Sequence, residues 1–190
     1  MNNYIITNNV CKEWEQIYEI ARNDRSHALW QNYQDIDLAD YQAMIINVRD
    51  RIPAAFHGVY NGGRWPKNTA RICNRAYINP YFRDLGQGLE ITADNIKYVL
   101  NLYDFWGRDV LFITRGVQYD NPTVSYRKFE KFAEFVTKST GYVFDFDDQL
   151  YKCCPNESKD CYQFALWYDP KGIRKTLDIK SITQEQWINL

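Results

Sequence analysis

The sequence has neither a surplus of charge nor a long apolar run, and both absences narrow its function. Its 190 residues carry 23 lysines and arginines against 24 aspartates and glutamates, a net charge of −1. A general DNA-binding surface gains affinity by neutralising phosphates, so this balance disfavours a nucleic-acid ligand. The first residues are polar, and the chain lacks the run of about 18 apolar residues that a membrane helix needs. We therefore expect no membrane partner.

Cysteine is sparse and irregularly spaced. The chain has five, an odd number: Cys11, Cys73, Cys153, Cys154 and Cys161. No Cys-x-x-Cys pair or nearby histidine offers zinc ligands. The small acidic group at 145–148 also lacks the spacing or histidine of a metal site, so we expect no metal. We interpret the cysteines as reduced thiols of a cytoplasmic protein.

The composition is that of one globular domain. Hydrophobic residues make up 45% of the chain and charged residues 25%, which excludes a disordered chain. The 16% of aromatic residues could stack on single-stranded nucleic acid, but that use also needs a basic groove. We expect a single domain, with an N-terminal helical part over 1–40, a core over 41–168 and a tail over 169–190.

Hydrophobic spacing predicts the first half of this domain. Apolar positions at helical spacing predict a helix over 10–21, followed by a short helix and a loop over 24–40. Three β-prone runs over 41–48, 52–60 and 68–78 are separated by turn signals. These adjacent runs favour an antiparallel meander.

The second half alternates helices and strands. Apolar spacing predicts a helix over 92–106, and a nearly continuous apolar run over 109–114 indicates a covered strand. The crossover between the preceding strand and this one implies a parallel pairing. A helix over 122–140 and strands over 142–146 and 161–168, joined by a hairpin connection, complete the α/β (α+β) domain.

The chain is organised around a glycine turn between the third strand and the next helix. This turn reads Ile78-Asn-Pro-Tyr-Phe-Arg-Asp-Leu-Gly-Gln-Gly88, so that Arg83, Gly86 and Gly88 have the spacing Arg-x-x-Gly-x-Gly. Glycines let the backbone approach a ligand closely and adopt positive φ. The N–H groups of such a turn and helix start make a site for phosphate. The pattern predicts a pyrophosphate cradle; the alternative is a strand-to-helix turn that needs glycine for geometry alone.

This element order, with the turn in this place, resembles the GNAT family of N-acyltransferases. The family signature follows the fourth strand and reads Gln/Arg-x-x-Gly-x-Gly/Ala, often preceded by Val-x-Pro, and the segment from Ile78 to Gly88 matches it. Family members commonly end the second helix with Ala, an aromatic residue and then Gly-Phe; Ala133 and Gly141-Tyr142 stand at the Ala and Gly-Phe positions. The resemblance covers residues 41–168 and implies a mixed, mostly antiparallel twisted sheet flanked by helices.

The sequence departs from the family pattern at three places. Thr137 stands where many members have a tyrosine that protonates the departing thiolate of coenzyme A. Glu130 stands where an asparagine often contacts the cofactor. No aspartate or glutamate lies between Arg64 and Arg83, so the fourth strand supplies no carboxylate base. These departures concern the chemistry and leave the expected fold intact.

The resemblance implies an acyl-coenzyme A cofactor, with acetyl-CoA as the expected donor. The backbone N–H groups of Asp84 to Gly88 would hold the pyrophosphate. The pantetheine arm would lie where the strand over 68–78, the family's fourth, splays near Ile78 from the strand over 109–114, the family's fifth, near Phe112. A backbone N–H around Ile78 would polarise the thioester carbonyl. The implied cofactor-binding residues are Ile78, Asn79, Arg83, Asp84, Leu85, Gly86, Gln87 and Gly88.

Two tyrosines are the catalytic candidates. Tyr77 could hydrogen-bond the acceptor amine or relay its proton, and Tyr126 could act as the acid in place of the missing phenol. His27 and His57 are alternative bases, and Cys73 an alternative nucleophile, but direct transfer without a covalent intermediate is the simpler hypothesis.

The expected function is an N-acetyltransferase acting on an amine of a small molecule or peptide. The alternative is a GNAT-fold binding or regulatory protein without transferase activity, which the departures at Thr137 and on the fourth strand favour. The sequence leaves the oligomeric state open, with a dimer as one option.

Overall fold

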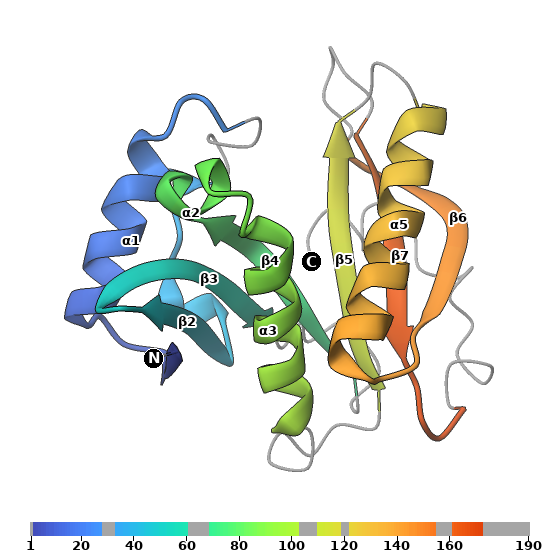
Figure 1. The fold of residues 1–190 in the computed structure, drawn as a ribbon, viewed down its shortest axis with the longest axis horizontal. Helices are drawn as coiled ribbons and strands as arrows, with labels where there is room; N and C mark the ends of the chain where they lie inside the picture. The colour runs from blue at the N-terminus through green and yellow to red at the C-terminus, as the bar shows by residue number, and fades with distance from the viewer. Residues whose placement is uncertain are drawn as a thin grey trace.

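The computed structural model in Figure 1 describes residues 2–27, 33–60, 69–102, 110–118, 122–154 and 161–172. They form a seven-stranded sheet with the order β1-β2-β3-β4-β5-β7-β6. The strands are β1 (Asn2–Thr7), β2 (Ala43–Arg49), β3 (Ile52–Tyr60), β4 (Thr69–Ile78), β5 (Val110–Gln118), β6 (Asp145–Cys154) and β7 (Cys161–Tyr168). The helices are α1 (Lys12–Asn23), the 3-10 helix η2 (Leu38–Asp40), α2 (Pro80–Asp84), α3 (Gly88–Asn101) and α5 (Pro122–Thr140).

The strand pairing confirms the predicted topology. Strands β2, β3 and β4 pair antiparallel, and β4 pairs with β5 in parallel after the α3 crossover. β7 pairs antiparallel with both β5 and β6. The β2–β3 connection is a two-residue turn in which Asp50 and Arg51 have φ of 48° and 69°. Such positive φ values match the twist of the flanking strands.

Three elements near the N-terminus and the glycine turn differ from the prediction. Strand β1 was not predicted; it is an edge strand that pairs antiparallel with β2. The short helix α2 was also not predicted, and α3 begins at Gly88 and not at Thr92. The Thr92 hydroxyl donates to the Gly88 carbonyl at 2.8 Å, so it bonds inside the helix and does not cap it. The predicted end of this helix, beyond residue 102, lies outside the described residues.

Strand β6 is longer and starts later than predicted. The alternation over 142–146 indicated its start, and residues 151–160 were interpreted as a hairpin connection. The strand instead runs through Cys154 because β7 lies alongside, with Asp145 opposite Trp167 and Cys154 opposite Cys161. Pairing with a neighbouring strand overrides the local polar composition here. The predicted tail lies outside the described residues beyond Gly172.

The sheet separates two cores. Every residue of β2 is buried, and its alternate side chains serve opposite faces. Ile45 packs with α3, α5 and β7, in a cluster with Val99, Val136 and Leu166. Met44 and Ile46 pack with α1 on the other face, in an aromatic cluster that includes Trp14, Tyr33, Phe56 and Tyr77. Among the described residues, no helix is both long enough and apolar enough to span a bilayer.

Candidate functional site

Strands β4 and β5 separate before β4 reaches Ile78, near which the sequence predicted an opening. Over the described residues of both strands, the register runs from Thr69 opposite Val110 to Ile72 opposite Ile113 and no further. Figure 1 shows the two strands diverging toward their carboxyl ends, with α2 following β4. On β5 the divergence begins after Ile113, because Phe112, named in the prediction, still pairs with Arg71.

A β-bulge in β4 accompanies this divergence. Phe56 of β3 lies opposite Tyr77 and Gly58 opposite Asn74, so three steps along β4 match two along β3. Arg75, inside the bulge, has a φ of 55°. A bulge bends its strand and increases the local twist. The bulge therefore turns the end of β4 away from the direction of β5.

The backbone of Ile78 faces the side of β5. The N–H of Asn79 donates to the Ala54 carbonyl of β3 at 2.8 Å, and Ile78 is the residue opposite Ala55. In an antiparallel ladder, successive residues direct their N–H groups to opposite edges. The N–H of Ile78 is consequently directed toward β5, in the region beyond the last β4–β5 pair. This is the orientation that a donor to a thioester carbonyl between the strands would need.

Asn79 holds the glycine turn to the sheet. Its side-chain oxygen accepts from the Tyr81 N–H at 3.1 Å, and its side-chain nitrogen donates to the Pro53 carbonyl at 3.0 Å. The first contact caps α2, and Pro80 suits the first position of that helix. The Asn79 side chain is thus occupied by structural contacts.

Several N–H groups of the turn donate hydrogen bonds to carbonyls of the preceding helix α2. The N–H groups of Leu85, Gly86 and Gln87 donate to the carbonyls of Tyr81, Arg83 and Phe82 at 3.4, 2.9 and 3.0 Å, respectively. From the glycine motif we predicted that these N–H groups, with those of Asp84 and Gly88, hold a pyrophosphate. The internal bonds reduce what this part of the turn can offer to a ligand.

The start of α3 offers further donors, of which only Gly88 belongs to the predicted cradle. The first N–H groups of an α-helix have no acceptor within the helix, which here concerns Gly88, Leu89 and Glu90, and the Gln87 side chain makes no capping bond. Gly86, just before them, has a φ of 73° and so needs glycine. A Cβ on Gly88 would meet its nearest atom, Arg83 Cγ, only at 4.0 Å.

Tyr77 faces α1, where it contacts a carboxylate that the sequence gave no reason to place there. Its hydroxyl donates to Asp24 Oδ2 at 2.8 Å, and the Arg83 guanidinium pairs with the same oxygen. The Ser26 hydroxyl donates to Asp24 Oδ1 at 2.5 Å. The His27 ring centroid lies 5.7 Å from that of Tyr77. These residues form a cluster, here called the Asp24 cluster, at the end of β4.

Two opposite pKa shifts describe the Asp24 cluster. Burial raises the pKa of Tyr77, and the hydrogen bond to Asp24 and its charge raise it further, so the phenol stays protonated. Burial alone would raise the pKa of Asp24, but hydrogen bonds from Ser26 and Tyr77 and the charge of Arg83 outweigh it and lower that pKa. The cluster is therefore a phenol and a guanidinium that share an ionised carboxylate.

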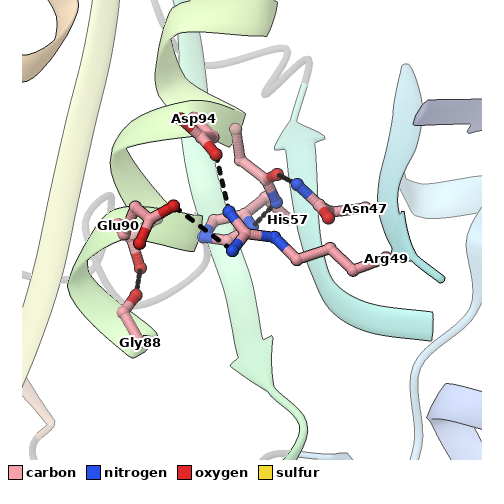
Figure 2. Close-up of polar contacts among 8 residues, drawn as sticks. Asn47, Arg49, His57, Gly88, Glu90 and Asp94 are labelled. Carbon is pink, nitrogen blue, oxygen red and sulfur yellow. Dashed lines mark hydrogen bonds and ion pairs between the residues drawn. The ribbon is translucent and has the colours of Figure 1, made fainter. Parts of the chain in front are cut away.

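A second polar cluster fastens α3 to β2 and β3 on the opposite face (Figure 2). Asn47 donates to Asn95 Oδ1 at 2.9 Å, and Asn95 Nδ2 lies 2.5 Å from His57 Nδ1. Arg49 lies 2.6 Å from Asp94 and 3.4 Å from Glu90. Asn47 and Asn95 are fully buried, and His57 is 2% exposed. We call this group the α3 clamp; it places His57 inside the packing between helix and sheet.

The charges around Asp94 in the α3 clamp have opposing effects on its pKa. Burial raises the pKa of Asp94, and the neighbouring charge of Glu90 adds to this, while Arg49 opposes both. One arginine therefore compensates two carboxylates in the first half of α3. Its removal would leave both acids without their cation.

The other predicted chemical residues are only partly described. Tyr126 and Cys73 lie in α5 and β4, and their side chains are outside the described residues. Thr137 and Glu130 lie on α5, half-buried and exposed, respectively. The structure therefore brings Tyr77 and Arg83 together at Asp24, and the place of Tyr126 relative to them stays a prediction.

An open hollow lies beside the turn on the side away from β5. It has a volume of about 510 Å³ and is lined by Asn79, by α1 and by the β2–β3 hairpin: Gln16, Glu19, Ile20, Arg51, Ile52 and Pro53. Because β3 separates it from the β4–β5 divergence in strand order, it does not correspond to the expected path of the pantetheine arm.

Comparison with solved structures identifies the fold as that of the GNAT acyl-CoA N-acyltransferases. The chain is similar to a probable acetyltransferase from Staphylococcus epidermidis, with a TM-score of 0.54 and 13% identity over 87% of this chain and 98% of that chain. A putative phosphinothricin N-acetyltransferase has a TM-score of 0.53 and 13% identity over 88% of this chain and 98% of its own.

A third structure carries the family name. A putative GNAT-family acetyltransferase from Desulfovibrio desulfuricans has a TM-score of 0.53 and 10% identity, over 87% of this chain and 98% of that chain. Neither protein-family models nor curated protein sequences give a match. At these identities the likeness establishes the fold, which confirms the expectation drawn from the glycine motif and element order.

Proposed function

We propose that this protein is an acetyltransferase that uses acetyl-CoA to acetylate an amine. The observation that carries the proposal is the divergence of β4 and β5, with the Ile78 N–H directed toward β5 and the start of α3 close by in sequence. The same fold is found in solved structures described as acetyltransferases. A strand end that has left its parallel neighbour, beside a helix start, suits a long ligand that ends in a diphosphate.

Different backbone N–H groups would bind the two ends of acetyl-CoA. Acetyl-CoA would supply an activated acetyl group as a thioester. The N–H groups of Gly88, Leu89 and Glu90 and the positive end of α3 would hold the diphosphate. The Ile78 N–H would donate to the thioester carbonyl oxygen, where negative charge develops during attack.

Direct attack by the acceptor is the simplest mechanism. The neutral amine nitrogen forms the new C–N bond while the C–S bond breaks; the nitrogen then loses a proton, and the departing thiolate takes up a proton to become the thiol. Thr137 replaces the tyrosine that resembling proteins use for that last proton, so Tyr126 remains our proposed acid. Tyr77 remains a proposed relay, although its hydroxyl now donates to Asp24.

A second function is favoured by the same two observations. Thr137 at the tyrosine position and the occupied phenol of Tyr77 fit a protein that binds CoA without turning it over. For either function we propose a cytoplasmic protein, since the irregular cysteines suit a reducing compartment.

Release of free thiol from acetyl-CoA separates the two functions. We expect thiol release that depends on an added amine, tested with polyamines, aminoglycosides, amino acids and peptides with free N-termini. Binding of CoA without release on any of these classes would favour the binding protein. A folded sample that binds no CoA at millimolar concentration would contradict both.

A further inference from the structure

The ion pair between Arg83 and Asp24 occupies the arginine of the glycine motif. Arg83 lies in the last turn of α2. Its guanidinium pairs with Asp24 Oδ2, and its Cζ lies 5.6 Å from the Tyr77 ring centroid. A positive charge that stands three residues before Gly86 is thus held by a carboxylate of the protein itself.

The stem of Arg83 lies against the start of α3. Its Cγ is 4.0 Å from the position that a Cβ on Gly88 would take, which is ordinary van der Waals distance. The guanidinium lies beyond Cγ on rotatable bonds with several staggered positions. Rotation about these bonds can therefore move this charge from Asp24 toward the first N–H groups of α3.

The position of Arg83 at Asp24 leaves one of its donors unsatisfied. Arg83 Nε is buried and has no hydrogen-bond partner within the described part of the chain. A buried donor without an acceptor costs free energy. A diphosphate can accept two parallel N–H groups from one guanidinium, so the arginine would gain contacts by moving to it.

We infer that Asp24 sets the affinity for coenzyme A by competing with the diphosphate for Arg83. This inference rests on the proposed function. Without ligand, Asp24 holds the guanidinium; with the diphosphate at the start of α3, the guanidinium pairs with phosphate oxygens. Tyr77 and Ser26 continue to donate to Asp24 and keep its charge satisfied. Breaking the Asp24–Arg83 pair takes up part of the binding free energy.

Titration calorimetry of the full chain with coenzyme A tests the sign of this effect. Asp24→Asn keeps one side-chain oxygen, which can accept from the Tyr77 or the Ser26 hydroxyl, and it removes the charge that holds Arg83. We expect this variant to bind coenzyme A about fivefold more tightly than the wild type, the worth of a partly exposed ion pair. Equal or weaker binding would overturn the inference, because Asp24 would then only fasten or orient the arginine.

Two controls separate this competition from a general charge effect. Glu19→Gln removes a negative charge from an exposed side chain of α1 (65% exposed), and we expect unchanged affinity. Pantetheine lacks the diphosphate, so Asp24→Asn should not alter its binding. An equal gain in Glu19→Gln, or for pantetheine, would contradict a role through Arg83.

A double-mutant cycle ties the effect to the arginine. Arg83→Gln should weaken coenzyme A binding, and Asp24→Asn should bring no gain in the Arg83→Gln background. A gain that persists there would overturn the inference. If folded wild type and Asp24→Asn both bind no coenzyme A, the proposed function fails; if the wild type binds and Asp24→Asn binds no more tightly, only the competition fails.

Discussion

The Asp24 cluster anchors the helix before the glycine turn, and the α3 clamp anchors the helix after it. The central charged group is an acid in the first cluster and an arginine in the second. In the Asp24 cluster, one acid from the segment after α1 holds the arginine of α2. In the α3 clamp, one arginine of β2 holds two acids of α3. The turn between Gly86 and Gly88 thus lies between two anchored helices. Its geometry depends on residues that are distant in sequence.

The two clusters differ in which of their side chains are buried. From this difference we infer that the clamp supports the fold and that Arg83 can change partners. The clamp contains fully buried asparagines and an Arg49 that is 8% exposed. In the Asp24 cluster the arginine is the more exposed partner: the Arg83 side chain is 29% exposed and that of Asp24 7%. A buried network of neutral side chains resists rearrangement, whereas a partly exposed guanidinium can exchange partners at lower cost. We expect stability to depend on the clamp and ligand affinity to depend on the Asp24 cluster.

The largest predicted effect is the loss of Asn95. Asn95→Ala removes one partner each from Asn47 and His57 in a fully buried site and leaves a void. We expect the free energy of unfolding to fall by about 3 kcal/mol, measured by urea denaturation. Asn101→Ala, on the same helix, is the control, since it loses only an exposed hydrogen bond from the Tyr142 hydroxyl. A loss no larger than the control would mean that the clamp is not a support.

Loss of Arg49 should have the next largest effect. Arg49→Ala leaves Asp94 and Glu90 without their cation, and Asp94 is only 34% exposed. We expect a loss of about 2 kcal/mol in the same assay. Arg22→Ala breaks an exposed pair with Glu19 at 3.7 Å and should cost about 0.5 kcal/mol or less. Similar losses in both variants would remove the distinction between clamp and surface pairs.

The Asp24 cluster should contribute less, and its contribution should depend on pH. We expect Asp24→Asn to lower the free energy of unfolding by about 1 kcal/mol at neutral pH. Because the pKa of Asp24 is lowered in the fold, its stabilisation is present above the pKa of the unfolded chain. It is lost as pH falls through the folded pKa. Urea denaturation across the acid range should show the free energies of unfolding of the wild type and Asp24→Asn converging as pH falls. A constant difference between them would contradict an ionised Asp24.

The smallest predicted effects distinguish the two glycines of the motif. Gly86→Ala places a side chain at a φ of 73° and should cost about 1 kcal/mol. Gly88→Ala meets nothing closer than 4.0 Å and should change stability by about 0.5 kcal/mol or less. Thermal unfolding of the pair measures this. A larger cost at Gly88 would mean that both glycines serve geometry alone.

Sequence reasoning found the elements whose signals are local. Hydrophobic spacing located α1, α5 and the β2–β4 meander, and the glycine motif located the turn and the fold. Thr92 misled the start of α3, because its hydroxyl bonds back to Gly88 in place of capping the helix. The start of β6 was displaced because its pairing with β7, and not its own composition, sets its extent.

The polar clusters could not be found from sequence. Asp24 lies in a polar segment and meets Arg83 across 59 positions, so no spacing rule connects them. Asn47 and Asn95 are 48 positions apart, and each is unremarkable in its own element. Such pairs are set by the packing of α1 and α3 on the sheet. They become visible only once the two helices are placed.

The central claim is that the start of α3 and the end of β4 bind coenzyme A, and amide chemical shifts test it residue by residue. In ¹H–¹⁵N spectra of the full chain, added coenzyme A should shift the amide signals of Ile78, Gly88, Leu89 and Glu90 in a saturable manner. The shifts should be far smaller at Lys12 and Glu13, at the distant start of α1. Saturating coenzyme A that leaves the four amides unmoved, or that shifts only residues elsewhere, would contradict the account.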